Sequence, residues 1–541
     1  MKSIKDPVYG YIEIEERYFR LIDTAGFQRL RNIRQTSYQA LYPSALHNRF
    51  VHSLGVFYLG MKAIAFFYQN SKEYISRVMN DDEWDEIRET FVLACLLHDV
   101  GHSPFSHTGE EYYKLGADLQ SMLMKEIHSA EFSTDAMNGI GNPHEAMSVL
   151  IGLDLCRDKD FEIDDELFAR AIIGLKYSKE DNSPRTVINN AVITMLNGKL
   201  IDVDKLDYLT RDAFGTGFSS LTIDVDRLLS GYTICKDKAG TFQIAYKQRA
   251  HSVIENVIYA SDLERRWIQC HPAILYDSAL LEFAIRYYDK GMRSLSQSKM
   301  DGLHTVFVKE ALTESGLYSE GVPIRLLCDD DIISHIKNNY SHTPIAQQLF
   351  SRDARLKPIW KSETAFEEYS RVELAPDIAM ELLDDLRGTL DFLQAHTDFF
   401  INEKALASAE NEYKKAEGLG GSGGSRSLYS YGRVKHICEL FGRFCNDFLL
   451  PDFEFAVVIA SIFESSYRKV EYESINIAIA ENRMVGINKL LSVKALQENT
   501  DKPTSLFYVY TTETNLQSAD RAGISLEKEF YAFFRKNYRR G

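Results

Sequence analysis

Hydrophobic and polar positions follow a helical period over the first 400 residues. Apolar residues recur at intervals of three and four in VFYLGMKAIAFFYQN (56–70), ELFARAIIGL (166–175) and VINNAVITML (187–196). This is the spacing of an amphipathic helix that packs one face against a core. The unbroken apolar run FVLACLL (91–97) is typical of a buried helix. The pattern therefore predicts a mainly α fold for this part of the chain.

A stretch rich in glycine and serine, AEGLGGSGGSRSLYSYG, interrupts the pattern around 416–433. Because such a composition cannot form a packed core, we expect a flexible linker or a surface loop there. A natural loop and an engineered linker over 418–425 are both compatible with this composition.

Beyond this stretch, short segments rich in β-branched and aromatic residues predict strands. They are FEFAVVIASIF (453–463), SINIAIA (474–480) and SLFYVYTT (505–512). We expect these segments to form a small sheet, closed by a helix near 527–538.

Length and composition narrow the class of protein. A chain of 541 residues exceeds what one hydrophobic core usually supports, so two or three packed units are expected. With 45% hydrophobic and 26% charged residues, the chain has the make-up of a soluble globular protein. No window approaches the ~18 uninterrupted apolar residues of a membrane span, and MKSIKDPVYG at the start lacks the apolar segment of a signal peptide. We therefore expect a cytoplasmic protein that does not associate with membranes.

Charge and cysteine content exclude further classes. The net charge of -16 argues against a protein that binds nucleic acid over its whole surface, so a small anionic ligand would need a focused positive site. The seven cysteines are scattered and form no CxxC pair, which argues against a disulfide framework and against a cysteine zinc site. We expect buried, reduced thiols.

Candidate chemistry follows the buried helix directly, in LACLLHDVGHSPFSH (93–107). This segment carries His98, Asp99, His102 and His107. Polar side chains at a buried helix end are costly unless they are hydrogen-bonded or bind a ligand. If the helix continues, His98 and His102 project from one face, while Asp99 turns toward a neighbouring wall.

Two distant segments can complete a metal site. HNRFVHS (47–53) supplies His47 and His52, and IDVDKLDYLTRD (201–212) supplies four aspartates. Nitrogen and oxygen ligands without thiolate suit Mn, Fe, Mg, Ni or Zn, so the donor set leaves the metal open. The alternative is structural, because a lone buried histidine is more often a core residue and an acidic cluster is usually solvated.

Together, HNRFVHSLGV, LLHDVGHSPFSH and IDVDKLDYLTRD resemble the HD-domain superfamily. Within it, the chain is most similar to the deoxynucleoside triphosphate triphosphohydrolases, the dGTPase-like family. The resemblance is greatest to the metazoan branch that joins a sterile-alpha-motif domain to an HD domain. It begins at KDPVYGYIEI, becomes loose beyond about 290, and includes no sterile-alpha-motif domain.

The resemblance implies a mainly α fold, with an HD-domain helical core and a smaller α+β region at the C-terminal end. The expected parts are an HD phosphohydrolase core over 1–290 and a helical extension over 291–415. The linker or loop at 416–433 and an α+β region over 434–541 would follow.

The resemblance also implies roles for individual residues. The implied metal ligands are His52, His98, Asp99 and Asp204. Phosphate contacts would come from Arg49 and Lys205, and contacts with the deoxyribose from Gln35, Tyr208 and Asp212. His107 would activate or orient water, His102 and His144 would deliver protons, and Glu110 stands where the family has an aspartate. For each residue the alternative is a structural role, such as an ion pair for Arg49 or a core position for Tyr208.

The implied reaction is hydrolysis of a dNTP at the α-phosphorus, which releases a deoxynucleoside and inorganic triphosphate and lowers the dNTP pool. In a microbial cell such an enzyme could balance DNA precursors or starve an invading phage, an expectation that rests on family analogy alone. Two alternatives remain open. One is an HD-family phosphodiesterase or nuclease that acts on DNA or RNA, and the other is an idle site in a nucleotide sensor.

A second group of residues lies near the start of the chain, at KDPVYG and LIDTAGFQRLRNIRQ. Lys2, Asp23, Gln28 and Arg31 match family positions that bind a guanine nucleotide at a subunit interface, so the resemblance implies activation by GTP or a dNTP and a homo-tetramer or other homo-oligomer. The alternative is an ordinary amphipathic helix with a basic face.

Three positions depart from the family pattern. Ile268 stands where the metazoan enzyme has a tyrosine under the sugar, a phosphate-binding arginine is missing near Ala260, and Thr36 replaces a leucine. These departures leave the preferred base and sugar open.

Overall fold

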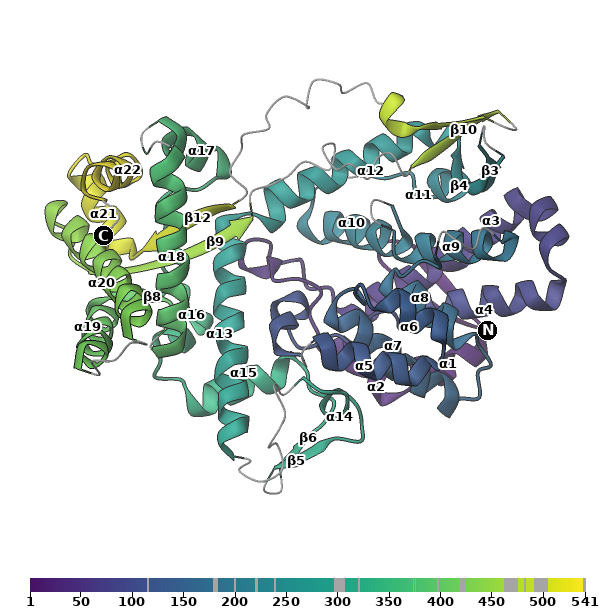
Figure 1. Ribbon diagram of the computed structural model, residues 1–541, viewed down its shortest axis with the longest axis horizontal. Coiled ribbons are helices and arrows are strands. Elements are labelled where there is room, and N and C mark those ends of the chain that lie inside the picture. Colours follow the sequence, from purple (N-terminus) through teal and green to yellow (C-terminus); the bar gives the residue numbers. More distant parts are fainter. Residues whose placement is uncertain are drawn as a thin grey trace. The chain divides into compact units, whose positions relative to one another are not determined.

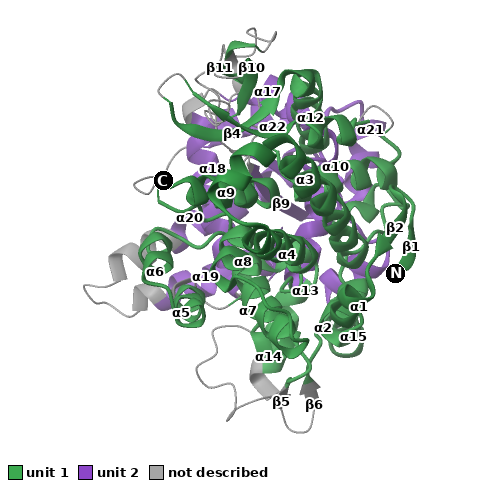
Figure 2. Ribbon diagram, turned by 90° about the vertical axis from the view of Figure 1, so that its right-hand side faces the viewer, with its two compact units in different colours: residues 1–265, 284–339, 464–498 green, residues 266–283, 340–463, 499–541 purple. Residues whose placement is uncertain are grey.

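The computed structural model describes most of the chain. It covers residues 1–113, 116–178, 183–198, 201–218, 222–237, 240–295, 307–319, 322–372, 374, 376–396, 398–418, 424–461, 475–480, 483–490 and 505–538. Two compact units are distinguished in Figure 2, each assembled from three stretches of chain. Unit 1 comprises Met1–Arg265, Ala284–Asn339 and Glu464–Glu498, and unit 2 comprises the remaining residues. The four consecutive parts expected from the sequence stay a prediction.

The predicted mainly α fold is confirmed, and unit 1 is built around one long helix, α3 (Arg49–Val78). It packs against α4 (Asp81–Leu97), α9 (Pro184–Leu196) and α10 (Val203–Thr216) (Figure 1). Asn48 caps its N-terminus by accepting a hydrogen bond from the amide of Val51. The predicted helices at 56–70, 166–175 and 187–196 lie in α3, α8 (Asp165–Ile173) and α9.

Among the described residues, α3 is long and apolar enough to cross a membrane by length and composition alone. However, 67% of its most apolar window is buried inside the protein. A core helix passes this test as readily as a spanning helix, so α3 is weak evidence for a membrane.

The other helices of unit 1 surround this core. They are α1 (Glu16–Ile22), α2 (Ala25–Gln28), α5 (Gly116–Ile127), α6 (Ala130–Ala136), α7 (Pro143–Asp158), α8, α11 (Val225–Leu229), α12 (His251–Glu264), α14 (Lys309–Leu312) and α15 (Asp329–Asn339). The helix α13 (Pro272–Leu295) contributes residues to both units.

Among its described residues, unit 1 also contains three small antiparallel or mixed sheets. β1 (Lys2–Asp6) and β2 (Gly10–Ile14) form a hairpin, which we call the N-terminal hairpin. A four-stranded sheet has the order β11-β10-β4-β3, and a third pairs two short strands. The remaining bounds are β3 (Tyr232–Lys236), β4 (Phe242–Lys247), β5 (Leu317–Ser319), β6 (Val322–Ile324), β10 (Asn476–Ala480) and β11 (Arg483–Gly486).

Unit 2 packs helices against a four-stranded antiparallel sheet of order β7-β12-β9-β8. Its strands are β7 (Lys357–Pro358), β8 (Phe400–Asn402), β9 (Glu454–Ser461) and β12 (Ser505–Thr511). Trp360 is fully buried, with ring centroids of Phe530 and Tyr531 at 5.5 and 5.2 Å. The helices are α16 (Pro344–Phe350), α17 (Glu363–Val372), α18 (Pro376–His396), α19 (Glu403–Gly418), α20 (Gly424–Asp447), α21 (Glu513–Arg521) and α22 (Leu526–Asn537).

The C-terminal region corrects two expectations. The three predicted strands are present as β9, β10 and β12, but they do not share one sheet, because β10 pairs in parallel with β4, more than two hundred residues earlier. Alternation of residues identifies a strand but not its partner. The predicted linker is also shorter than 416–433, since α19 continues to Gly418 and α20 begins at Gly424. Residues 419–423 lie outside the described residues.

The cysteines agree with the expected reduced state. All seven are free, and five are buried. Cys270 and Cys328 are partly exposed, so the expectation of burial is wrong for these two.

Candidate metal centre and active site

The side chains predicted as metal ligands converge in unit 1. His52 lies in the first turn of α3, His98 and Asp99 follow α4, and Asp204 lies in the first turn of α10. Nε2 of His52 is 3.3 Å from Nε2 of His98 and 3.0 Å from Oδ1 of Asp204. Nε2 of His98 is 3.4 Å from Oδ1 of Asp99 and 3.8 Å from Oδ1 of Asp204. Both imidazole nitrogens therefore lie within 4.0 Å of both carboxylates.

The turn after α4 separates two sets of histidines. The helix does not continue through His102, the condition under which His98 and His102 would share one face, because α4 ends at Leu97. The amide of His102 donates to the carbonyl of Asp99 instead, at 3.0 Å. Gly101 permits this turn to touch α7, since a Cβ there would lie 2.3 Å from the backbone nitrogen of Ser148. The tight turn directs His98 and Asp99 to one cluster and His102 to another.

Contacts behind the imidazoles fix their orientation. Nδ1 of His52 lies 2.7 Å from Oδ2 of Asp207, and Nδ1 of His98 lies 3.0 Å from the carbonyl of Cys95. Because an ionised carboxylate and a carbonyl can only accept, each Nδ1 donates and each Nε2 is left for a metal. Asp207 was one of the candidate carboxylates in IDVDKLDYLTRD. It contacts Nδ1 of His52, the ring nitrogen that does not face the other predicted ligands.

The charges of this cluster fit a divalent cation. Burial lowers the pKa of His52, but its bonds with Asp204 and Asp207 outweigh burial and raise that pKa to about 10. The nearby carboxylates therefore favour a doubly protonated His52 imidazole. Its positive charge balances them, as a bound divalent cation would. A metal needs a neutral imidazole, so it would replace that proton. His52, His98 and Asp99 also place one donor atom each within 4.8 Å of one another.

Arg49 lies beside the predicted metal ligands, and one terminal nitrogen of its guanidinium has no hydrogen-bond partner among the described residues. Its Nη1 donates to Oδ2 of Asp99 at 2.7 Å, and its Nε donates to Oγ of Ser106 at 2.9 Å. Burial raises the pKa of Asp99, but the Arg49 guanidinium outweighs it and holds that pKa well below its ordinary value. Nη2 of Arg49 is buried and has no hydrogen-bond partner among the described residues. A buried guanidinium arm without a partner is typical of an anion site.

A second cluster joins three histidines and Glu110. The rings of His102 and His144 stack with centroids 3.9 Å apart, and His107 lies 5.1 Å from each. Oε1 of Glu110 accepts from Nδ1 of His144 at 2.5 Å and lies 3.3 Å from Nδ1 of His107. The longer side chain at position 110 therefore still reaches both imidazoles. Burial and the nearby Arg49 lower the pKa of His102 well below its ordinary value.

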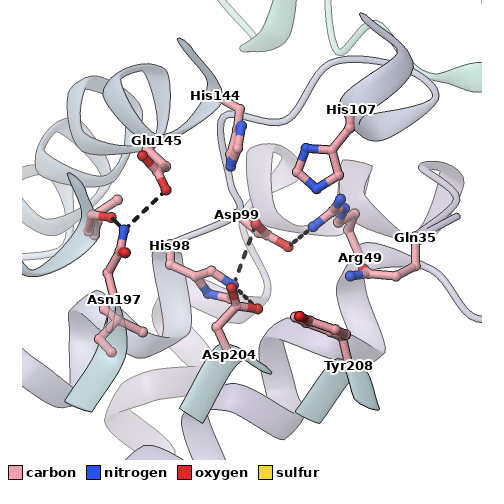
Figure 3. Close-up of a pocket in the computed structure, with 12 residues that line it drawn as sticks. Gln35, Arg49, His98, Asp99, His107, His144, Glu145, Asn197, Asp204 and Tyr208 are labelled. Atoms are coloured by element: carbon pink, nitrogen blue, oxygen red, sulfur yellow. Dashed lines mark hydrogen bonds and ion pairs between the residues drawn. The ribbon is translucent and has the colours of Figure 1, made fainter. Parts of the chain in front are cut away.

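Members of both clusters, among them His98, Asp99, Asp204, His107 and His144, line one pocket of about 100 Å³ (Figure 3). Arg49, Gln35, His107 and Tyr208 lie on one side of the His98 and Asp204 pair, as Figure 3 shows. On the other side lie Glu145 and Asn197, whose amide donates to Glu145 at 3.1 Å and to the carbonyl of Ile172 at 2.7 Å.

Sequence reasoning missed this second wall of the pocket. Glu145 directly follows His144, so its position beside the pocket had a signal in NPHEAMS. Asn197 had no signal, because it comes from the end of α9.

The residues predicted at the phosphates and sugar differ in their settings. Gln35 and Tyr208 line the pocket, and Oε1 of Gln35 is buried without a partner among the described residues. Lys205 and Asp212 are not among the lining residues of the described pocket. Nζ of Lys205 lies 3.7 Å from Asp202, and Oδ1 of Asp212 lies 2.6 Å from Nε2 of His47.

The residues predicted to bind a regulatory nucleotide lie near the N-terminal hairpin. Nε of Arg31 donates to Oε1 of Gln28 at 2.7 Å, and Asp23 is exposed at the end of α1. Lys2 lies 3.1 Å from Glu16 and places its ammonium over the ring of Phe19. The single helix considered as an alternative is not formed, because α2 ends at Gln28 and a 3₁₀-helix follows over Arg29–Asn32.

Arg29, in the same segment, has a structural role that the sequence did not indicate. It is buried, and its guanidinium donates to the carbonyls of Val100, His102 and Leu327. It therefore ties the turn that carries the metal ligands to the chain before α15.

The three departures from the family pattern are all at least partly buried. Ala260 is 1% exposed in α12, and Ile268 is fully buried in a π-helical turn of unit 2. Oγ1 of Thr36 is buried without a hydrogen-bond partner in the described part of the chain.

Comparison with known proteins agrees with this geometry. Residues 49–211 match the HD domain family, a range that contains every predicted metal ligand. The chain is 32% identical to the uncharacterized protein MG461 of Mycoplasma genitalium over 47% of its own length and 52% of that protein.

Two further relatives have named activities. The deoxynucleoside triphosphate triphosphohydrolase SAMHD1 homolog of Dictyostelium discoideum is 32% identical, over 44% of this chain and 40% of the relative. The mouse deoxynucleoside triphosphate triphosphohydrolase SAMHD1 is 30% identical, over 44% of this chain and 35% of the relative.

The chain thus spans about half, or less, of the length of these curated relatives. HD domains bind divalent metals, and the buried histidines and aspartates described above are positioned for one. The chain therefore contains an HD domain over residues 49–211 and is related, over part of its length, to the SAMHD1 deoxynucleoside triphosphate triphosphohydrolases.

Proposed function

We propose that the protein is a metal-dependent dNTP triphosphohydrolase, which cleaves a dNTP to a deoxynucleoside and inorganic triphosphate. One observation carries the proposal: three of the four predicted metal ligands, the Arg49 guanidinium with its free nitrogen, and His107 and His144 of the histidine cluster line the same pocket. The similarity to two named triphosphohydrolases supports the substrate class.

The metal would be held by His52, His98, Asp99 and Asp204. When bound there, a divalent ion supplies a Lewis acid that polarises a phosphoryl oxygen and lowers the pKa of water. The ligand set is compatible with Mn, Mg, Fe, Ni or Zn.

Arg49 would bind a phosphate oxygen through Nη2. Its other two nitrogens are already occupied by Asp99 and Ser106, so the free arm is held in position before substrate arrives. A preorganised cation of this kind stabilises the charge that develops on the phosphoryl group. Lys205 would contribute a second cation only after its ammonium turns away from Asp202.

The histidine cluster would move the protons. In the reaction, the oxygen of water bonds to the α-phosphorus, the bond from that phosphorus to the 5′-oxygen breaks, and the 5′-oxygen takes a proton. His107, which lines the pocket and is exposed, would orient or deprotonate the water, while His102 and His144 would deliver the proton. Glu110 would hold the tautomer of His144 through Nδ1, leaving its Nε2 for proton transfer.

Tyr208 and Gln35 would contact the deoxyribose, since both line the pocket. Asp212 would accept from the 3′-hydroxyl, with His47 holding its carboxylate. Lys2, Asp23, Gln28 and Arg31 would bind an activating nucleotide and favour a homo-oligomer. The contact between Gln28 and Arg31 and the exposure of Asp23 support this part of the proposal.

The test is incubation with Mn²⁺ or Mg²⁺ and all four dNTPs, with and without the four rNTPs, followed by separation of products. We expect deoxynucleoside and triphosphate, and no reaction with a His98→Ala, Asp99→Ala double variant. Formation of monophosphate or pyrophosphate alone would contradict the proposal. Cleavage of a labelled oligonucleotide while dNTPs survive would identify a nuclease instead.

Regulation is tested in the same assay. Stimulation by rNTPs, together with an increase in mass by light scattering, is expected for the wild type and not for Asp23→Asn. Equal rates and equal mass with and without rNTPs would contradict nucleotide regulation.

A further inference from the structure

The N-terminal hairpin ends in a carboxylate that points away from solvent. Asp6 closes β1 and is 4% exposed. Its Oδ1 accepts from the amides of Val8 and Tyr9, at 2.8 and 2.9 Å, and so shapes the turn toward Gly10. Its Oδ2 is left for a partner outside the hairpin.

That partner is Arg211 of α10. Nη1 of Arg211 donates to Oδ2 of Asp6 at 2.9 Å. The other two nitrogens of the guanidinium donate to Asp207, Nε to Oδ2 at 2.9 Å and Nη2 to Oδ1 at 3.0 Å. Oδ2 of Asp207 in turn accepts a hydrogen bond from Nδ1 of His52 at 2.7 Å. A continuous chain of charged hydrogen bonds thus runs from Asp6 to the metal ligand His52.

This chain of bonds has little freedom to move. Arg211 is 2% exposed, and Asp207 and His52 are fully buried. The guanidinium also lies near the ring of Tyr9, at 5.7 Å from its centroid. Gly55 also leaves room for the pair, because a Cβ there would lie 1.9 Å from Oδ1 of Asp207.

Charge alternates along the chain of bonds, and this gives Asp6 a function beyond shaping a turn. Without the negative charge of Asp6, the buried Arg211 guanidinium would have Asp207 as its remaining ionised partner in this chain of bonds. Asp207 would then be drawn toward Arg211 and would hold the Nδ1 proton of His52 less strongly. A weaker acceptor behind a metal-binding imidazole makes the imidazole a poorer ligand.

We propose that Asp6 is a positioning residue for the metal centre, and that the N-terminal hairpin acts on His52 through Arg211 and Asp207. The inference rests on the metal site of the proposed function, but it does not depend on the substrate.

The experiment is a calorimetric titration of the metal-free full chain with Mn²⁺. Asp6→Asn keeps an oxygen that can accept from Val8 and Tyr9 but removes the charge that faces Arg211. Glu13→Gln is the matched control, because Glu13 lies in the same hairpin and accepts from Ser3 at the exposed surface. We expect the Kd for Mn²⁺ to rise about tenfold in Asp6→Asn and to stay within about twofold of wild type in Glu13→Gln.

Two further variants keep the outcomes distinct. Asp6→Glu retains the charge and should recover most of the affinity, and it replaces Asp6→Asn if that variant does not fold. A wild-type Kd in Asp6→Asn, with only a lower Tm of the metal-free protein, would show a purely structural role and overturn the inference. His98→Ala tests the metal site itself: if wild type and His98→Ala bind Mn²⁺ equally, the proposed site fails before Asp6 is considered.

Discussion

Asp207 Oδ2 lies 2.7 Å from Nδ1 of His52, on the side of the imidazole opposite the nitrogen that faces the other metal ligands. Asp207→Asn removes the charge that makes this imidazole a strong ligand. We expect its affinity for Mn²⁺ to fall about 10- to 100-fold, more than in Asp6→Asn, because Asp207 contacts His52 directly. Calorimetric titration measures the change, and equal losses in Asp207→Asn and Asp6→Asn would argue against a graded effect along the chain of bonds.

Gly55 has no space for a side chain. In Gly55→Ala, the new Cβ would meet Oδ1 of Asp207 at 1.9 Å and Nη2 of Arg211 at 2.6 Å. We expect the free energy of unfolding to fall by about 1–3 kcal/mol, since neither buried group can move without breaking a charged contact. Urea denaturation measures it.

The matched control for this variant is Gly388→Ala. Gly388 lies within α18, and a Cβ there would meet nothing within 4 Å. Alanine should stabilise this helix position by about 0.5–1 kcal/mol, because glycine is the poorer helix former. A loss of stability at both positions would point to a general effect of the substitution and not to the site.

Arg49→Lys retains a positive charge but loses the planar fork. A lysine cannot contact Asp99 and Ser106 and still present a free nitrogen to substrate, so we expect kcat/KM for dNTP to fall about 10- to 100-fold. Arg185→Lys is the control, because Arg185 forms a half-exposed ion pair with Glu83. Steady-state kinetics at saturating metal measure the change, and kcat/KM should stay at the wild-type value in Arg185→Lys. A wild-type kcat/KM in Arg49→Lys would contradict the anion-binding role.

Asp329 makes stability depend on pH. Its carboxylate is buried and accepts from the amides of Phe105 and Arg34, at 2.8 and 3.0 Å. Burial outweighs these bonds and raises its pKa from 3.8 to about 6. Because the folded protein holds this proton more tightly than the unfolded chain, the associated stability is fully present below about pH 4.

That stability is lost as the pH rises to about 6 and stays lost above it. The loss amounts to about 3 kcal/mol for a shift of roughly two pKa units. In Asp329→Asn the group does not titrate, so the difference in unfolding free energy between wild type and variant should change by about 2 kcal/mol between pH 4 and 6.5. Denaturant titrations at several pH values measure it, and a constant difference would contradict the raised pKa.

Much of the metal cluster could be predicted from the sequence because its residues lie in short local motifs. His98 and Asp99 are neighbours, and His52 and Asp204 each lie in the first turn of a helix. The motifs and the family resemblance that they carry therefore predicted the cluster, although not the turn that presents His98 and Asp99. The end of α4 at Leu97 depends on the contact between Gly101 and Ser148, which are far apart along the chain.

Other features could not be predicted because they depend on long-range partners. The pairing of β10 with β4 and the contact of Arg29 with Leu327 leave no periodic signal in either segment. The same holds for Asp6, which reads as a turn residue in KDPVYG until Arg211 is placed beside it. Local pattern identified the elements, and tertiary contacts determined which of their polar residues serve the site.

The ion pair between Asp6 and Arg211 joins residues that are 205 positions apart. During synthesis at about 5–20 residues per second, roughly 10 to 40 s would separate the appearance of the two partners. The hairpin that begins the chain must therefore wait, without its buried partner, until α10 leaves the ribosome. Nascent chains that end before Arg211 should lack tight metal binding, so the centre can be completed only after α10 has been synthesised.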